Sequence, residues 1–285
     1  SITYVDTSGS AGTAWTAAYT TAAGDTGGAV TYSIAFSDLA GNAGTAVTAS
    51  TDSSVVTFNN STPTLTTVSI ASNNANTTTL AKVGDVITLT MTASEAISTP
   101  MINLQVGGIA IADASITYVD TSGSAGTAWT AAYTTASGDT DGLVTYSIAF
   151  SDLAGNAGTP VTSSTDSSAV TFDKTVPTLS SVVIASNNST PTIAKEGDVI
   201  TLTMTASEAI SQPVVTFQSG GADIDGSVSY TGTGTTWTAA YTPASVDTDG
   251  VVTYSIAFSD IAGNAGTAVT ASTDSSAVTL YKTGN

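Results

Sequence analysis

The sequence predicts an all-β protein built from tandem seven-stranded β-sandwiches that follow one another end to end. Three observations carry this prediction. The 285-residue chain contains long internal repeats, its apolar residues alternate with polar ones in short segments, and clusters of Gly, Asn, Asp and Ser separate those segments. An alternation with a period of two is typical of a strand that buries one face, and no stretch shows the helical period with its caps.

The internal repeats divide the chain into one half unit and two complete units. A second-half motif, SD-[LI]-AGNAG, occurs three times, whereas the first-half motif GDVITLTMTASEAIS occurs twice, from Gly84 and from Gly197. Residues 1–58 match residues 115–172 at all but six positions. We therefore expect the C-terminal half of a repeat followed by two complete repeats, over residues 1–60, 61–174 and 175–285.

Seven segments of the repeat 61–174 have the character of strands. The first is TLTTVSIAS, and the second contains VITLTMTA, in which large apolar residues alternate with threonines. MINLQVGG, SITYVD and AWTAAYT follow, and in the sixth segment, LVTYSIAFSD, the valine, tyrosine, isoleucine and phenylalanine share one face. The seventh is PVTSSTDSSAVTF. The predicted strands span 64–72, 85–94, 101–108, 115–120, 128–134, 143–152 and 160–172.

Seven strands in a repeat of this length are typical of an immunoglobulin-like sandwich. The Cys pair of antibody domains is missing because the chain contains no Cys, and the Trp that we expect to be buried comes from the fifth strand. We interpret the aromatic residues of the fifth strand as core residues rather than as an exposed platform for sugars. They are Trp15, Tyr19, Trp129, Tyr133, Trp237 and Tyr241.

The sequence resembles the bacterial immunoglobulin-like repeats of large surface adhesins and biofilm-associated proteins. The residues that carry the resemblance are the strand GDVITLTMTASEAIS (84–98), the SDLAGN loop (151–156) and the linker FDKTVPTL (172–179). The resemblance covers the whole chain and implies a tandem extracellular array at the cell surface, of a kind often stiffened by calcium. The first linker departs from the pattern, because it has Asn59 where the second has Asp173.

The composition excludes several classes of function. With Lys+Arg 4, Asp+Glu 22 and a formal net charge of −18, the chain cannot neutralise a phosphate backbone, so we expect no nucleic-acid partner. No apolar run approaches the roughly 18–20 residues that span a bilayer, so we expect no membrane insertion. Without His or Cys, the chain lacks an imidazole base and a thiolate nucleophile. Its paired carboxylates recur in the turns of every repeat, so we expect a protein that is not an enzyme.

The acidic residues are expected to gather where one repeat meets the next. When the strands of a sandwich alternate in direction, the loops after the second and sixth strands lie where the chain comes in, and the loop after the fifth lies where it leaves. The junction between the complete repeats then collects side chains from both sides: Asp139, Asp141, Asp173, Glu208, Asp260 and Asn264. The corresponding residues that face the preceding junction are Glu95, Asp152 and Asn156.

Such a group of like charges repels itself unless a cation neutralises it. Ca²⁺ is the cofactor that we predict, since it takes about six to eight oxygen ligands, and Mg²⁺ is less suited. The competing interpretation is that these residues only form turns and keep the chain soluble. At the first junction Asn59 and Asn60 replace the acidic linker residue and Gly27 replaces Asp141. We therefore expect that junction to bind calcium less tightly or to be more flexible.

The function that we expect is a non-catalytic, extracellular adhesin stalk on the order of 100 Å long. Its partners would be neighbouring repeats or identical subunits, with a surface glycan or protein as the target. The alternative is a subunit of a surface filament, sheath or S-layer-like polymer, in which a neighbouring chain supplies the strands that residues 1–58 lack. A window cut from a longer array would explain the half repeat as well. A third interpretation is a binding module that uses the segments in which the repeats differ, such as 100–113 and 213–226.

Overall fold

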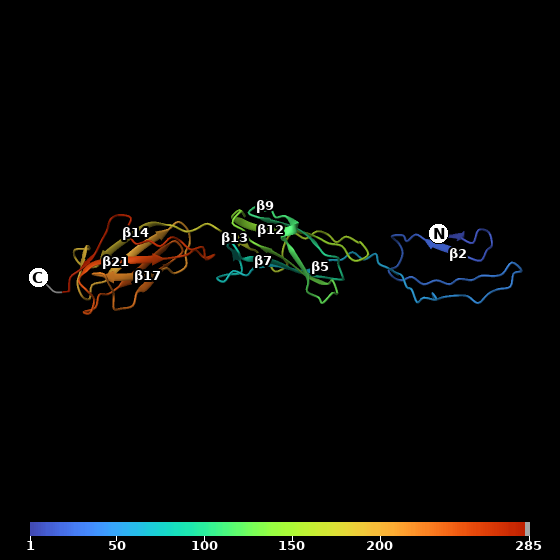
Figure 1. Cartoon of the computed structure of the whole chain (residues 1–285), viewed down its shortest axis with the longest axis horizontal. Helices are drawn as coiled ribbons and strands as arrows, with labels where there is room; N and C mark the ends of the chain where they lie inside the picture. The colour runs from blue at the N-terminus through green and yellow to red at the C-terminus, as the bar shows by residue number, and fades with distance from the viewer. Residues whose placement is uncertain (283–285) are drawn as a thin grey trace.

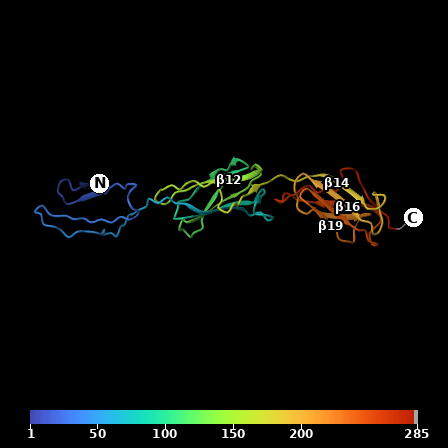
Figure 2. The ribbon, with the colours of Figure 1, turned by 180° about the vertical axis from the view of Figure 1, so that it is seen from behind.

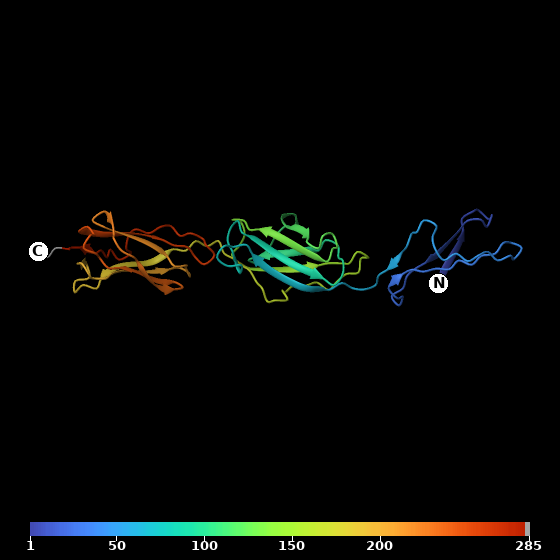
Figure 3. The same cartoon turned by 90° about the horizontal axis from the view of Figure 1, so that it is seen from below.

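The computed structural model describes residues 1–282 and shows three β-rich units in a row (Figure 1). The half repeat (residues 1–60) lies at one end, the first complete repeat (61–174) in the middle and the described part of the second complete repeat (175–282) at the other end. The view from behind in Figure 2 and the view from below in Figure 3 show the same extended arrangement. Within residues 1–282, no helix has the length and apolar character needed to cross a membrane.

The first complete repeat is a sandwich of two sheets. One sheet contains β5 (Leu65–Ser72), β7 (Val86–Ala93), β10 (Thr117–Asp120) and β11 (Ala128–Thr134), in the order β10-β11-β7-β5. The other contains β6 (Leu80–Ala81), β8 (Met101–Val106), β9 (Ile109–Ala110), β12 (Gly142–Ala149) and β13 (Thr171–Phe172), in the order β6-β13-β12-β8-β9. A 3-10 turn, η1 (Asp113–Ser115), precedes β10. This strand order is that of an immunoglobulin-like sandwich and confirms the predicted fold class.

The second complete repeat has the same architecture. Its first sheet contains β14 (Leu179–Ser186), β16 (Ile200–Ala206), β19 (Ser229–Thr233) and β20 (Thr236–Tyr241), in the order β14-β16-β20-β19. Its second sheet contains β15 (Ile193–Ala194), β17 (Val214–Ser219), β18 (Ala222–Asp223), β21 (Gly250–Ala257) and β22 (Thr279–Leu280), in the order β15-β22-β21-β17-β18. The tandem arrangement of two sandwiches therefore follows directly from the repeated sequence.

Each complete repeat encloses its own core, built from the alternating faces of its strands. In β7, Ile87, Leu89 and Met91 are buried while the threonines between them lie on the other face, as the period of two predicts. Tyr133 and its counterpart Tyr241 are buried, and the tryptophans of the same strands are half-buried against the core. The interpretation of these aromatic residues as core residues is confirmed in both complete repeats.

The half repeat contains β1 (Ile2–Asp6), β2 (Trp15–Tyr19), β3 (Gly28–Ala29) and β4 (Thr57–Phe58), which form two-stranded sheets β1-β2 and β3-β4. Here the core interpretation of the aromatic residues is wrong, because Trp15 and Tyr19 are 61% and 50% exposed. The strands that cover their counterparts belong to the first half of the repeat. For the same reason the segment after β3 does not continue as a strand, since β12 pairs with β8 in the complete repeat.

The predicted seventh strand, 160–172, is wrong over most of its length. Ladder pairing there is limited to β13 and a bridge between Val161 and Ile148, and isolated backbone hydrogen bonds join Val170 to Val144 and Thr165 to Val68. Side-chain hydroxyls take the place of backbone acceptors opposite β5: the Val68 amide donates to Thr165 Oγ1 at 3.1 Å, and the Ile70 amide donates to Ser168 Oγ at 2.9 Å. Serine and threonine side chains compete with backbone groups in this way, so a strand-like composition does not yield a regular strand.

Candidate metal centre

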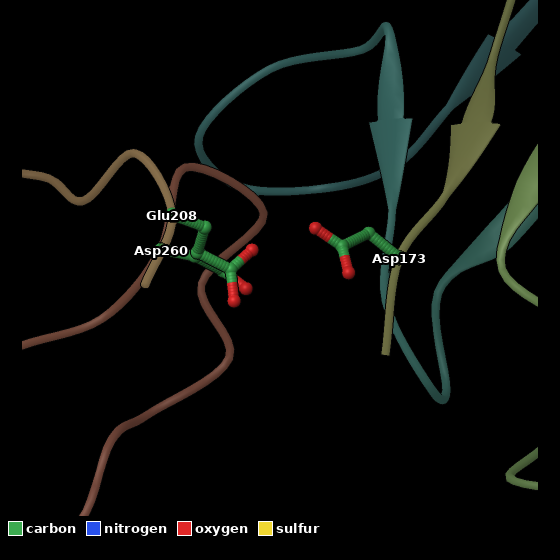
Figure 4. Close-up of side chains that lie close together, drawn as sticks. All are labelled: Asp173, Glu208 and Asp260. Carbon is green, nitrogen blue, oxygen red and sulfur yellow. The ribbon is translucent and has the colours of Figure 1, made fainter. Parts of the chain in front are cut away.

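Three carboxylates from two repeats meet at the second junction (residues 173–178). Asp173 follows β13 directly, Glu208 follows β16, and Asp260 lies beyond β21, where a bridge pairs it with Ile210. One carboxylate oxygen from each of the three lies within 4.8 Å of the others. Figure 4 shows Glu208 and Asp260 extending from one repeat toward Asp173 on the other. The structure thus brings together residues that are far apart in the sequence and belong to different sandwiches.

Hydrogen bonds from Asn264 hold Asp260 in this position. The Asn264 amide and its side-chain Nδ2 donate to the two carboxylate oxygens of Asp260, each at 2.8 Å. The same Nδ2 also donates to the backbone oxygen of Asp173 at 2.9 Å, across the junction. Asp260 is almost completely buried, so its side chain is fixed in a solvent-poor environment at the boundary between the repeats.

The electrostatics of the cluster are unfavourable without a cation. Burial raises the pKa of Asp173, and the nearby charges of Asp260 and Asp141 raise it further. Burial also raises the pKa of Glu208, with additional contributions from Asp173, Asp260 and Asp141. Within residues 1–282, Lys82 and Asp85 form an ion pair, but no lysine forms an ion pair with Asp173, Glu208 or Asp260. Lys174 Nζ instead donates to the backbone oxygens of Ser137 and Asp139.

The equivalent position at the first junction (residues 59–64) is closed by an amide. Asn59 Nδ2 donates to Glu95 Oε2 at 3.1 Å and to Asp152 Oδ2 at 2.9 Å. Asn156 Nδ2 donates to the backbone oxygen of Asn59 at 3.0 Å and to Asp152 Oδ2 at 2.8 Å. Burial acts to raise the pKa of Asp152, but the hydrogen bonds from Asn156 outweigh it and hold the pKa below its ordinary value. The Asn59 amide therefore takes the place that a cation would take beside two carboxylates.

The structure places the remaining predicted residues outside the three-carboxylate group. The Asp139 carboxylate accepts the hydroxyl of Tyr133 at 2.9 Å and the Ala136 amide at 2.8 Å, which makes it part of a turn. Asp141 accepts the Lys174 amide at 2.7 Å and the Thr175 hydroxyl at 2.6 Å, so it holds the linker. Its charge still acts on the cluster, as the raised pKa of Asp173 shows.

Two asparagines that sequence reasoning missed also connect the complete repeats. Asn74 Nδ2 donates to the backbone oxygen of Ala262 at 2.8 Å, and Asn76 Nδ2 donates to that of Ile261 at 3.2 Å. Both acceptors lie in the loop that contains Asp260 and Asn264. The signal in the sequence was the repeated IASNN, which recurs at Asn188. There the side-chain Nδ2 donates to Asp198 Oδ2 within the same repeat.

The donor set and its spacing fit a calcium ion. Carboxylate oxygens are the ligands that Ca²⁺ prefers, and bond lengths of about 2.3–2.6 Å place oxygens on opposite sides of one ion about 5 Å apart. The three oxygens lie within that span. Three carboxylates can supply up to about six ligand atoms, and backbone oxygens or water would supply the rest. Asp173, Glu208 and Asp260 are therefore the residues that could hold one ion between the repeats.

The pH dependence of stability in chelator is the first prediction from this cluster. Because the folded-state pKa values of Asp173 and Glu208 are raised, these two residues favour the folded state increasingly as the pH falls through those values. Carboxylates with lowered pKa values, such as Asp152, act in the opposite direction. We therefore compare the thermal midpoint of the unsubstituted chain with that of the Asp173→Asn variant, both in chelator. The unsubstituted chain should gain stability relative to the variant as the pH is lowered from about 7 to about 4.5. A constant difference in calorimetry would contradict the electrostatic account.

Comparisons with known proteins give structural matches only. No family model and no curated protein matches the sequence. A chimeric titin Z1Z2 structure matches 80% of this chain and 100% of its own, at 15% identity and a TM-score of 0.33. The D1-D2 structure of Rst matches 78% of this chain and 100% of its own, at 11% identity and a TM-score of 0.35. The D00-D0 structure of intimin matches 75% and 100%, at 13% identity and a TM-score of 0.25.

Proposed function

We propose that this chain is a non-catalytic, extracellular stalk segment of a bacterial surface adhesin, and that Ca²⁺ stiffens its second junction. The observation that carries the proposal is the group formed by Asp173, Glu208 and Asp260, which joins two repeats and has no positive partner among the described residues. A cation there would bind both repeats at once and fix their relative orientation. Extracellular modules suit this role, because their calcium sites work at affinities of about 10⁻⁴–10⁻³ M.

Architecture supports the same function. The units follow one another in a row (Figure 1), and the segments that connect them are short: β4 ends at Phe58 and β5 begins at Leu65, and β13 ends at Phe172 and β14 begins at Leu179. The segments 100–113 and 213–226, in which the repeats differ, form the hairpins β8-β9 and β17-β18 with the turns that follow them. β9 and β18 are exposed at the edge of the second sheet of each sandwich, whereas β8 and β17 also bury residues in the two cores.

Small-angle X-ray scattering with calcium and then with a chelator tests the proposal. We expect the maximum dimension to be largest with calcium, and the ensemble to broaden in chelator as the second junction loosens. Asp173→Asn is the matched control, because its amide can donate to Glu208 and Asp260 as Asn59 donates at the first junction. Scattering that is identical in calcium and chelator, together with no calcium binding by calorimetry, would leave these carboxylates as turn and linker residues.

A surface filament is the second candidate, because the half repeat exposes large apolar side chains. The same scattering experiment distinguishes the two functions. A stalk segment gives a particle of the mass of one chain, whereas a polymer gives particles many times heavier whose length increases with concentration.

A further inference from the structure

The loop of residues 260–264 in the second complete repeat also contacts the first complete repeat through uncharged groups. Asn74 Nδ2 donates to the Ala262 backbone oxygen at 2.8 Å, and Asn76 Nδ2 donates to that of Ile261 at 3.2 Å. We call these two hydrogen bonds the asparagine contact. Ala262 is fully buried, whereas its counterpart Ala154, in the same loop of the first complete repeat, is exposed. The burial of Ala262 therefore comes from the docking of this loop on the first complete repeat.

The side chain of Asn74 is fixed within its own repeat. Its Nδ2 also donates to Asp85 Oδ2, at 2.6 Å, and its Oδ1 accepts the Asn76 amide at 2.9 Å. The two hydrogens of Nδ2 thus serve Asp85 and Ala262. The counterpart Asn188 is held in the same way, by bonds to Asp198 Oδ2 at 2.8 Å and from the Thr190 amide at 3.1 Å. The arrangement belongs to the repeat itself, so the entropic cost of docking the loop is low.

Gly263 shows how closely the loop is seated. A Cβ at this position would lie 3.1 Å from Asn76 Nδ2 and 3.6 Å from Lys82 Cε. The equivalent Gly155 has almost the same backbone conformation, with a φ of +94° against +91° for Gly263, and no atom lies within 4 Å of its Cβ position. A side chain at residue 263 would therefore push the loop off the first complete repeat, whereas one at residue 155 would not.

The asparagine contact and the three carboxylates respond differently to the loss of a cation. The contact joins neutral amides to neutral carbonyl oxygens, so it needs no counter-ion. Glu208 instead faces Asp173 as a like charge, and like charges repel when no cation lies between them. Removing calcium therefore weakens one set of interactions across the second junction and leaves the other in place.

We propose that the asparagine contact is a calcium-independent pivot of the second junction. It keeps the loop 260–264 docked on the first complete repeat while Glu208 turns away from Asp173 when no ion is bound. The junction then opens by rotation about the docked loop, and the two repeats do not separate. The contribution of calcium to this motion rests on the proposed function, whereas the docking of the loop does not.

Thiol labelling of Ala262→Cys tests the pivot, because the chain contains no other Cys. The reference is Ala154→Cys, whose thiol lies in the same loop of the first complete repeat and is exposed. In chelator we expect Ala262→Cys to react at least about tenfold more slowly than Ala154→Cys, because a contact that is open about 10% of the time or less exposes the thiol rarely. Equal rates would overturn the proposal.

Two substitutions, each with a matched control, break the contact in the Ala262→Cys chain. Asn76→Asp places a carboxylate oxygen against the Ile261 carbonyl oxygen and should raise the labelling rate in chelator toward that of Ala154→Cys. Asn73→Asp adds the same charge to the same turn and keeps the acceptor for the Val86 amide, so it should leave the rate unchanged. Gly263→Leu should raise the rate as well. Its control, Gly155→Leu, should not. Equal rates in Asn76→Asp and Asn73→Asp would show that the asparagine contact does not hold the loop.

A second measurement covers the case in which Ala262→Cys itself disturbs the docking. Spin labels are placed at Thr145→Cys and Thr253→Cys, two exposed and equivalent positions in β12 and β21. In chelator we expect a broader distribution of distances between the labels in the Asn76→Asp chain than in the Asn73→Asp chain. Distributions that are the same in these two chains would overturn the pivot.

Adding calcium separates this proposal from the proposed function. We expect calcium to narrow the distance distribution of the doubly labelled chain and to leave the slow labelling of Ala262→Cys unchanged. No narrowing, together with no calcium binding by calorimetry, would overturn the proposed function but not the docking of the loop, which the results in chelator decide. Labelling of Ala262→Cys that is slow with calcium and fast in chelator would mean that the ion holds the loop, and the pivot would be wrong.

Discussion

Exchanging the linker residues of the two junctions is expected to exchange their dependence on calcium. Asp173→Asn removes one of three carboxylates and introduces an amide that can donate to Glu208 and Asp260. The geometry for this exists at the first junction, where Asn59 donates to Glu95 and Asp152. We expect calcium affinity at the second junction to fall by at least about 10–100-fold, the range seen when groups around a metal are removed. We also expect the variant to keep its extended form in chelator.

The converse change, Asn59→Asp, is expected to create calcium dependence at the first junction. It replaces the amide donor between Glu95 and Asp152 with a third carboxylate. Without a cation, the three negative charges repel one another and disfavour close contact between the two units at this junction. Gly27 stands where the second junction has Asp141, so the double variant with Gly27→Asp should respond more strongly. Calorimetric titration with calcium and scattering in chelator measure both changes. Unchanged calcium affinity in Asp173→Asn would show that the ion, if bound, lies elsewhere.

Replacing the same isoleucine in two copies of one strand is expected to give opposite results. Ile148 is fully buried, so Ile148→Ala should lower the free energy of unfolding of the first complete repeat by about 2–5 kcal/mol through lost contacts and the cavity left behind. Ile34 has the same local sequence but is exposed, so Ile34→Ala should change stability by less than about 0.5 kcal/mol.

Urea unfolding of both variants, followed by tryptophan fluorescence and hydrogen exchange, measures this difference. The pair is well matched because the neighbouring residues of the two isoleucines are identical from Val30 to Phe36. A large loss in Ile34→Ala would mean that the exposed apolar side chains around Ile34 are buried in solution, which self-association of the chain would explain. Sedimentation of the unsubstituted chain then identifies the species responsible.

The regular strands could be predicted because their pattern depends on local sequence. The alternation in β7 predicted both the strand and its buried face, and the repeated motifs predicted the tandem sandwiches. The segment 160–172 could not be predicted in the same way. Its composition is strand-like, but Thr165 and Ser168 bond to β5 through their hydroxyls, and composition does not distinguish a hydroxyl acceptor from a backbone one.

The candidate site was predictable in part, since strand order places loops from two repeats at one junction. That reasoning brought Asp173, Glu208 and Asp260 together but treated Asp139 and Asp141 as equivalent to them. The structure separates these two because the Tyr133 hydroxyl holds Asp139 and the linker holds Asp141. Such competition between partners depends on side-chain position, which the spacing of residues in the sequence does not specify. The role of Asn59 as a hydrogen-bond donor could not be predicted from the sequence either. The sequence shows only that an uncharged Asn stands at the position that Asp173 occupies in the second junction.

The parallel pairing of β6 with β13 has a consequence for a chain under tension. β13 ends where the chain leaves the repeat, and the Thr171 and Asp173 amides donate to Thr79 and Ala81 at 2.9 and 2.8 Å. A pull on the two ends of the repeat acts along these strands, so their hydrogen bonds are sheared together instead of opening one after another. Asp173 takes part twice, since its amide closes this pair while its carboxylate faces the next repeat. An ion held at the junction would therefore also resist the sliding of β13, and its removal should lower the force at which the first complete repeat ruptures.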